Sequence, residues 1–268
     1  MKKNILFWTL AFIITVGSAA YQRMTGPTHP LKGKVILANR EIKYTLDRSC
    51  DTSTNYKLQI KTGDPSIVGF IIWKRYKTND EWNKVQMNYI DVKLSGELPK
   101  QPMAGKLQYS VMLKSNESTV RLPENDQVVV RFKGDVPTSV LIVHVIVMFM
   151  GMLFSNRAGI ESFAKEPNFK KFIFWTLGLL AAGGLVLGPI VQKYAFGVYW
   201  SGWPFGIDLT DNKTMFAFIS WVLAAFSIYK FKNPKRWILA AAIITLAVYL
   251  IPHSLLGSEL DYSKLPQQ

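Results

Sequence analysis

The sequence predicts a two-part α+β protein, in which an antiparallel β-sandwich is joined to an α-helical transmembrane bundle. Residues 22–135 are densely charged and carry short apolar runs that alternate with polar positions, as half-buried strands do. Residues 136–252 are dominated by long apolar stretches between short basic clusters, as membrane helices are. Residues 1–21 form a further apolar segment behind a basic start, and residues 253–268 are expected to form an outer tail.

The N-terminal segment begins with Lys2 and Lys3 and continues into an apolar run from Ile5 to Val16. This pattern is typical of a signal peptide or of a short signal anchor. Small residues from Gly17 to Ala20 suit signal peptidase, but an uncleaved anchor is preferred, because the later apolar segments make the chain a membrane protein in either case. Both alternatives export the residues that follow.

Four later segments are apolar enough to cross a hydrocarbon core of about 30 Å, which takes roughly twenty helical residues. The expected spans are Pro137–Ser155, Phe172–Val191, Thr214–Tyr229 and Trp237–Ile251. Together with the first segment, they predict a bundle of one N-terminal helix and four C-terminal helices.

The lysine and arginine residues of the short connections predict the orientation of these helices. One side holds Lys2, Lys3, Arg157, Lys165, Lys170, Lys171, Lys230, Lys232, Lys235 and Arg236, whereas the other holds Lys193, Lys213 and Lys264. The more basic side is expected to be cytoplasmic. The prediction is a multi-pass protein of the bacterial inner membrane with a cytoplasmic N-terminus, a periplasmic β domain and an outer aromatic loop at 191–213.

The formal net charge of +14 would also suit a nucleic-acid-binding protein. Much of the excess lies beside the apolar segments, where the positive-inside bias and anionic lipid head groups account for it. The sequence contains no recognisable nucleic-acid-binding motif. Membrane lipid is therefore an expected partner, and nucleic acid is not.

Three runs in the outer domain alternate between apolar and polar residues, as strands with one buried face do. Stretches rich in glycine, proline, asparagine and aspartate separate the runs and predict turns. About seven strands in roughly 110 residues is the number expected for an immunoglobulin-like sandwich. The apolar positions are Tyr56, Leu58 and Ile60; Leu107, Tyr109, Val111 and Leu113; and Val128, Val130 and Phe132.

The middle of this domain resembles bacterial immunoglobulin-like or fibronectin type III-like modules. The residues that carry the resemblance are the strand Val68–Tyr76, the following strand Trp82–Met87, the Leu98-Pro99 turn and the Gly-then-Tyr strand Ala104–Val111. The resemblance covers about half of the outer domain. It implies a sandwich fold and a tendency to bind proteins or glycans, and it supplies no catalytic residues.

Four tryptophans are candidates for partner binding, because an indole ring offers a large and rigid contact surface. For Trp73 and Trp82 the favoured alternative is packing in the core or at the edge of the sandwich. For Trp200 and Trp203 in the aromatic loop it is an interfacial aromatic belt. The loop is expected to end in a helix cap, with a lid over a cofactor site as its other interpretation.

Histidine at membrane depth is costly and therefore raises a functional hypothesis. His144 and His253 are expected in the same leaflet, where they could act as axial ligands of a b-type haem. His144, Met148 and Met152 follow at i, i+4 and i+8 on one helical face, and imidazole with thioether sulfur suits copper. The favoured alternative is structural, with packed methionines and a hydrogen-bonded histidine.

No catalytic motif is recognisable in the sequence, and the single cysteine, Cys50, is expected to be an unreactive thiol. The function expected is a non-enzymatic envelope protein without a cofactor, in which the sandwich binds a membrane or periplasmic protein and the helices anchor it. Such a protein could be an accessory or assembly subunit of a larger complex, or form an oligomer. The alternative is a haem- or copper-binding membrane module.

Overall fold

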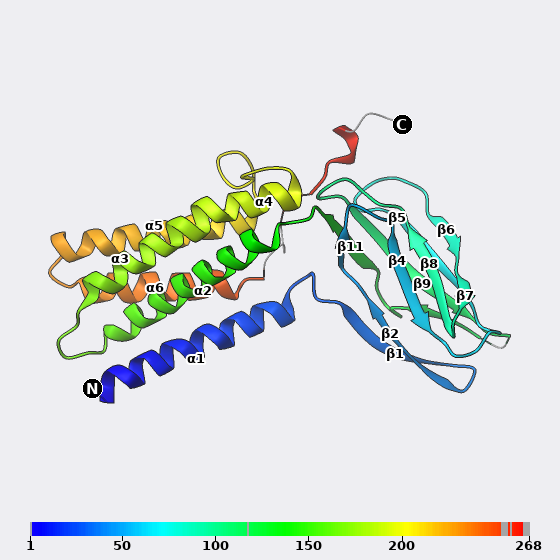
Figure 1. Cartoon of the computed structure of the whole chain (residues 1–268), viewed down its shortest axis with the longest axis horizontal. Coiled ribbons are helices and arrows are strands. Elements are labelled where there is room, and N and C mark those ends of the chain that lie inside the picture. Colours follow the sequence, from blue (N-terminus) through cyan, green and yellow to red (C-terminus); the bar gives the residue numbers. More distant parts are fainter. Residues whose placement is uncertain (1, 117, 253–256, 258, 265–268) are drawn as a thin grey trace. The chain divides into compact units, whose positions relative to one another are not determined.

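The computed structural model shows two compact units, each built from separate parts of the chain (Figure 1). The helical unit combines residues 1–27 with 136–258, and the β unit combines residues 28–135 with 259–268. The residues described are 2–116, 118–252, 257 and 259–264.

The helical unit consists of six α-helices and one π-helical segment in the described part of the chain. Their bounds are α1 Lys2–Thr25, α2 Thr138–Glu161, α3 Phe169–Leu180, the π-helical η1 Ala181–Leu187, α4 Gly188–Phe196, α5 Leu209–Lys230 and α6 Pro234–Leu250. The segments α3, η1 and α4 follow one another without a break and form one helix from Phe169 to Phe196.

Three of these helices are long and apolar enough to cross a membrane, namely Lys3–Thr25, Thr138–Glu161 and Phe169–Phe196. The sequence predicted five such spans. The two remaining segments are helical, and α5 packs against α3 and α6, whereas α6 also packs against α2. These two helices are not among the three, because α6 has only 17 residues and α5 begins with the polar run Thr210–Lys213.

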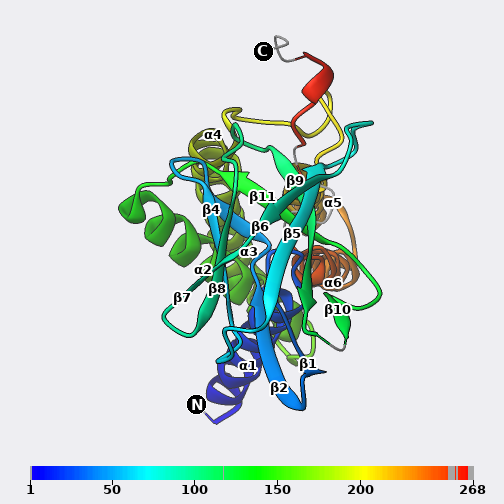
Figure 2. The same cartoon turned by 90° about the vertical axis from the view of Figure 1, so that its right-hand side faces the viewer.

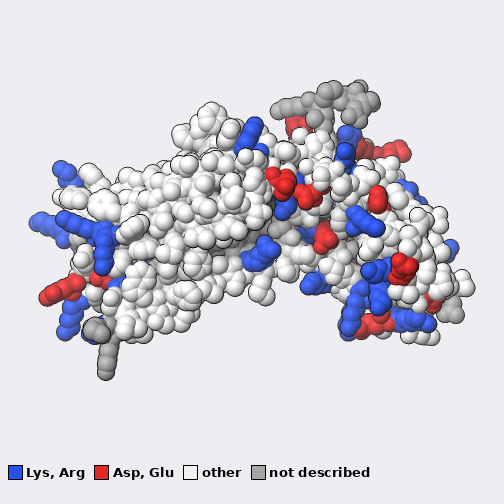
Figure 3. Space-filling view, viewed as in Figure 1, with Lys and Arg blue, Asp and Glu red and all other residues white. Residues whose placement is uncertain are grey.

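The exterior of the helical unit is apolar along the helices. Ile142, Val143, Val145 and Ile146 of α2 are each at least 50% exposed. On the face seen in Figure 3, side chains other than Lys, Arg, Asp and Glu cover the length of the helices, and lysine and arginine gather at the end where α2 connects to α3. Water does not favour such a surface, whereas lipid does, so the helices are those of a membrane-associated protein.

One pair of buried polar side chains in this unit, Trp221 and Thr245, is hydrogen-bonded. Trp221 is fully buried, and its indole N–H donates to the Thr245 hydroxyl oxygen at 2.8 Å. That hydroxyl in turn donates to the Ala241 carbonyl oxygen at 2.8 Å. The buried polar atoms thus avoid the cost of an unmet hydrogen bond in an apolar interior.

The β unit contains eleven strands among the described residues, more than the seven expected, because several are only three or four residues long. Their bounds are β1 Leu31–Leu37, β2 Arg40–Leu46, β3 Ser49–Asp51, β4 Tyr56–Lys61, β5 Val68–Arg75, β6 Asn83–Gln86, β7 Asn88–Ile90, β8 Lys93–Leu98, β9 Lys106–Lys114, β10 Thr119–Leu122 and β11 Val128–Lys133. All lie in three sheets.

The largest sheet has the order β3-β11-β9-β5-β6, with β10 also paired to β9. A three-stranded sheet has the order β4-β8-β7, and β1 and β2 form a hairpin. Figure 2 faces the β unit and shows β4, β7 and β8 on one side and β9 and β10 on the other. The pairs are antiparallel except for β3 with β11, which is parallel, so the expectation of a wholly antiparallel domain is wrong at this edge.

A single apolar core joins the three sheets. It includes Leu37 of β1, Leu58 of β4 and Val111 of β9, each at most 1% exposed. The alternation predicted for β4 is confirmed, since buried and exposed residues alternate along its whole length. In β9 the polar Ser110 is buried as well, because β9 is a central strand with β5 on one side and β11 and β10 on the other.

Two tyrosines connect the opposing sheets at the core. The Tyr109 hydroxyl of β9 donates to the Asp47 carbonyl oxygen at 3.0 Å, and the Tyr56 hydroxyl of β4 accepts from the Asp47 N–H at 3.1 Å. Close packing continues at Gly96 of β8, where a Cβ would lie 2.8 Å from the Ile71 Cδ1 of β5. The sheets therefore approach one another as tightly as layers of a protein interior do.

Cys50 on β3 is expected to react slowly with maleimides. Burial, together with the nearby carboxylates of Asp51 and Asp47, raises the pKa of its thiol to about 12. Because the thiolate is the nucleophile, its rate at about pH 8 should be at least ~100-fold below that of an exposed cysteine. Intact mass against time measures the rate, and a rate within tenfold of free cysteine contradicts the burial of Cys50.

Candidate functional site

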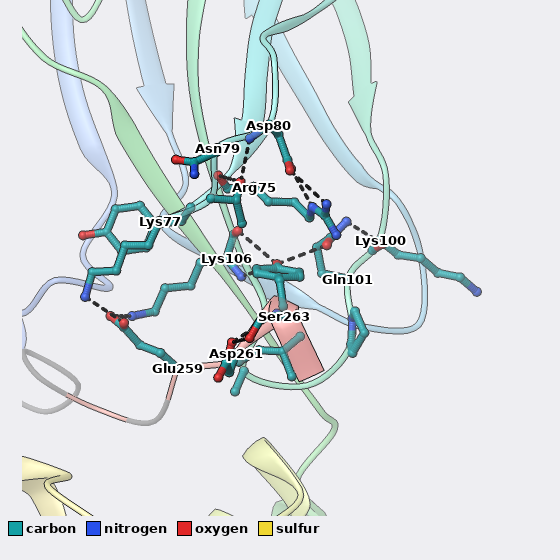
Figure 4. Close-up of a pocket in the computed structure, with 16 residues that line it drawn as sticks. Arg75, Lys77, Asn79, Asp80, Lys100, Gln101, Lys106, Glu259, Asp261 and Ser263 are labelled. Atoms are coloured by element: carbon teal, nitrogen blue, oxygen red, sulfur yellow. Dashed lines mark hydrogen bonds and ion pairs between the residues drawn. The ribbon is translucent and has the colours of Figure 1, made fainter. Parts of the chain in front are cut away.

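An open pocket with a volume of about 1180 Å³ lies within the β unit alone (Figure 4). Three parts of the unit line it: the β5–β6 connection, the β8–β9 connection with the start of β9, and the segment Glu259–Ser263. Its charged and aromatic lining residues are Arg75, Tyr76, Lys77, Asp80, Lys100, Lys106, Glu259, Asp261 and Tyr262.

Arg75, the last residue of β5, is fixed by Asp80 from the following turn. Two parallel hydrogen bonds join them, from Nε to Oδ2 at 2.5 Å and from Nη2 to Oδ1 at 2.9 Å. The hydrogen bond from Arg75 lowers the pKa of the Asp80 carboxyl. The pair is bidentate, which holds the planar guanidinium group in one orientation at the pocket wall.

Glu259 bridges two lysines on the opposite wall. Its carboxylate accepts from the Lys77 ammonium group at 2.8 Å and from the Lys106 ammonium group at 2.6 Å, as Figure 4 shows. Lys106 is nearly buried, with its side chain 12% exposed, and burial lowers the pKa of its ammonium group despite the hydrogen bond that it donates to Glu259. A buried lysine of this kind stabilises an anion placed against it.

Tyr262 holds the segment Glu259–Lys264 against the start of β9. Its hydroxyl oxygen accepts from the Lys106 backbone N–H at 2.9 Å and lies 3.1 Å from two acceptors, the Gln101 side-chain oxygen and the Lys106 carbonyl oxygen. The Arg75 guanidinium lies over its ring, 5.0 Å from the centroid. The backbone contributes a further bond from the Leu260 N–H to the Ala104 carbonyl oxygen at 3.3 Å.

The pocket is basic apart from this segment. Arg75, Lys77, Lys100 and Lys106 contribute four positive charges to its lining, and Asp80 is the only acid from the rest of the β unit among the lining residues that the structure describes. Glu259 and Asp261 of the segment contribute the other two negative charges. The chemistry of the pocket therefore suits the binding of carboxylate-bearing groups beside aromatic rings.

Acid is expected to loosen the Glu259–Lys264 segment. Burial raises the pKa of Glu259, but the hydrogen bonds from Lys106 and Lys77 outweigh it, and the net pKa lies below the ordinary 4.5. At a pH above the ordinary pKa, the Glu259 carboxylate is charged and stabilises the segment through its two lysine contacts. This stabilisation is lost as the pH falls through the lowered pKa.

Hydrogen exchange of the peptide that contains Leu260, corrected for intrinsic rates, measures the effect. Protection should fall between about pH 6 and about pH 3.5 in the native chain. In the Glu259→Gln variant, protection of this peptide should be lower than in the native chain at about pH 6, and it should not change between about pH 6 and about pH 3.5. Equal protection of the native chain at both values contradicts the role given to the Glu259 carboxylate.

The four candidate tryptophans lie in different units. Trp73 on β5 is half-buried against the β core and lines a second, smaller pocket of about 420 Å³. Trp82 is 43% exposed, with the Lys74 ammonium group 5.3 Å from its ring centroid. Because Arg75, Asp80 and Gln101 line both pockets, Trp73 belongs to the same region of the β unit as the basic pocket.

Trp200 and Trp203 lie in the helical unit, in a loop fixed to the first turn of α5. The Asp211 carboxylate accepts from the backbone N–H groups of Ser201 and Gly202 at 2.7 and 3.0 Å. Asp208 caps α5 by accepting from the Thr210 N–H at 2.7 Å, as the sequence predicted. The Trp203 side chain is 65% exposed and thus available to lipid or to a partner.

His144 of α2 faces the π-helical segment. Its Nδ1 lies 3.1 Å from the Gly183 carbonyl oxygen, which can only accept, so Nδ1 carries the proton and Nε2 the lone pair. The two methionine sulfurs each accept a weaker hydrogen bond at 3.8 Å, Met148 from the Tyr249 hydroxyl and Met152 from the Ser18 hydroxyl. His253 lies outside the described residues.

Within the described ranges, no group of three or more His, Cys, Asp and Glu side chains is placed to hold a metal ion. Comparison of the chain with protein-family models, with curated proteins and with solved structures gives no match. The geometry of the basic pocket and the apolar helices therefore provide the basis for a functional proposal.

Proposed function

We propose that this protein is a non-enzymatic protein of the bacterial envelope, anchored in the inner membrane, whose exported β unit binds a partner protein. The observation that carries the proposal is the basic pocket on a β unit that has its own core. The chain joins this unit to the helical unit at residues 27–28, 135–136 and 258–259, and three helices of that unit are apolar enough to cross a membrane. A tethered unit with a charged, aromatic pocket suits recognition rather than a purely structural role.

The membrane arrangement proposed has five spans, with α5 and α6 added to the three longest helices. Lysine and arginine gather in the connections from α2 to α3 and from α5 to α6 and beside the N-terminus, which supports a cytoplasmic location for these ends. The three connections of the β unit, at residues 27–28, 135–136 and 258–259, then leave from the other side. The aromatic loop with Trp200 and Trp203 lies at the outer interface in this arrangement.

The β unit is proposed to be an immunoglobulin-like or fibronectin type III-like sandwich. Support comes from the two opposed sheets around one core and from Trp73 on β5, which packs against that core. Domains of this architecture commonly present their binding surfaces on the connections at the sheet ends, which is where the basic pocket lies.

Photo-cross-linking in living cells tests the proposal. A photoreactive amino acid at Lys100, which lines the pocket, should yield a discrete adduct with another envelope protein. The matched control is the same residue at Lys57, an exposed position of β4 that does not line the pocket. Absence of an adduct from Lys100, or the same adduct from both positions, contradicts a partner site at the pocket.

A second candidate function, haem or copper binding in the helical unit, is favoured by the hydrogen bond between His144 and Gly183. Metal-binding histidines commonly donate one ring N–H to a carbonyl oxygen, which leaves the other nitrogen for the metal. A Soret band or bound copper in the detergent-purified protein, lost in His144→Ala, would support this candidate. A colourless, metal-free protein would contradict it.

A further inference from the structure

We propose that the basic pocket recognises an acidic, tyrosine-containing segment of a partner protein, and that the chain's own residues Glu259–Lys264 occupy part of this site. The inference rests on the proposed function and specifies its partner chemistry. The sequence Glu-Leu-Asp-Tyr-Ser is held in place by contacts of the kind that a bound peptide makes. Its residues therefore indicate which side chains the site accepts.

The charge of Glu259 is matched by two lysines of the pocket. Glu259 lies between Lys77 of the β5–β6 connection and Lys106 at the start of β9. Without Glu259, the nearly buried Lys106 would be left without its ion-pair partner, beside Lys77. A carboxylate is thus required at this place, and an incoming acidic side chain meets the requirement as well as Glu259 does.

Tyr262 fills an aromatic subsite of the pocket. Tyr262 lies three residues after Glu259, and the Arg75 guanidinium over its ring is held there by Asp80. Its hydroxyl group reaches the backbone of Lys106 and the side chain of Gln101. Glutamate and tyrosine at this spacing therefore fill two adjacent subsites. One binds a carboxylate through ion pairs, and the other binds a phenol ring through stacking and hydrogen bonds.

The pocket has room for a ligand beside the segment. The pocket keeps a volume of about 1180 Å³ with the segment in place, and the Lys100 ammonium group has no bond among the residues that the structure describes. A ligand can therefore enter beside the segment through Lys100 and then displace Glu259 and Tyr262. Because the segment belongs to the same chain, it competes at a high effective concentration and weakens the apparent affinity for any partner.

Fluorescence anisotropy with the detergent-purified full chain tests the inference. The probe is a labelled synthetic peptide of the sequence Ser-Glu-Leu-Asp-Tyr-Ser-Lys. Releasing the segment with Glu259→Ala and Tyr262→Ala together should tighten probe binding at least ~10-fold, as expected when the free site is populated less than about a tenth of the time. The milder Tyr262→Phe should act in the same direction with a smaller effect.

The pocket side chains are tested in the released variant. Lys77→Glu or Lys100→Glu should weaken probe binding at least ~10-fold, whereas Lys57→Glu, the same charge change on the exposed face of β4, should leave it within about twofold. A probe with lysine for glutamate and alanine for tyrosine should not bind. Raised salt should weaken the genuine complex, because its contacts are ionic.

Three results would overturn the inference. The released variant could bind the probe no more tightly than the native chain, although both unfold at the same temperature. Lys57→Glu could weaken binding as much as Lys77→Glu, which would indicate unspecific attraction. A fall in oligomeric mass on release would identify a second copy of the chain as the donor of the segment. If only peptide binding fails while cross-linking at Lys100 persists, the proposed function stands without this partner chemistry.

Discussion

Glu161→Ala is expected to destabilise the helical unit by about 3–5 kcal/mol, because it leaves a buried charge without its partner. Arg157 is 3% exposed, and its guanidinium donates to the Glu161 carboxylate and to the Asn4 side chain. The other Glu161 oxygen accepts from the Asn168 N–H at 3.0 Å. One carboxylate therefore joins the end of α2 to the start of α3, and through Arg157 to α1.

Thermal unfolding in detergent, followed by tryptophan fluorescence, measures this effect. A loss of 3 kcal/mol should lower the midpoint by at least about 6 °C for a chain of this size. The control is Glu166→Ala in the same α2–α3 connection, where the side chain is exposed and the change should stay within about 0.5 kcal/mol. Equal midpoints for the two variants would contradict the buried ion pair.

A double substitution separates loss of the pair from loss of packing. Arg157→Met combined with Glu161→Leu removes both charges and keeps apolar volume against Phe172, whose ring centroid lies 4.5 Å from the guanidinium carbon. Its midpoint should exceed that of Glu161→Ala, because no unpaired charge remains.

Phe132→Ala should destabilise the β unit by about 3–5 kcal/mol through the cavity it creates. Phe132 on β11 is fully buried in the core that all three sheets share. The matched control is Ile36→Ala on β1, where the side chain is 75% exposed and the expected change is within about 1 kcal/mol.

Hydrogen exchange followed by mass spectrometry assigns this loss to the correct unit. Peptides from β9 and β11 should exchange much faster in Phe132→Ala, whereas peptides from α2 and α6 should not change, because each unit has its own buried core. Slow exchange of β9 in the variant would show that Phe132 does not stabilise the core.

The fold was predictable where the sequence has a long, regular period. Strands β4, β9 and β11 follow the alternation of their side chains, and α2 follows an apolar run of the length that a span needs. Three-residue strands such as β3 have no measurable period, and its parallel pairing with β11 depends on long-range contacts. The sequence gives no sign of the π-helical turns that precede Pro189, which has no backbone N–H to donate, yet the helix runs on past it to Phe196.

The basic pocket was not predictable from the sequence. Lys77 and Glu259 are 182 positions apart, and nothing local marks either as one half of an ion pair. Sequence reasoning selected tryptophan, histidine and methionine because these residues are rare or costly in their context, whereas lysine and glutamate are ordinary on a surface. The one available signal was Tyr262 after the acidic residues Glu259 and Asp261 in an otherwise basic chain.

The central claim is that the helices carry the β unit across the membrane and leave the α2–α3 connection in the cytoplasm. Labelling of spheroplasts with a membrane-impermeant maleimide tests it in a Cys50→Ser background, with Lys57→Cys in the β unit and Lys165→Cys between α2 and α3, both exposed positions. Lys57→Cys should be labelled at once, and Lys165→Cys only after lysis. Labelling of Lys165→Cys alone in unbroken spheroplasts would contradict the account.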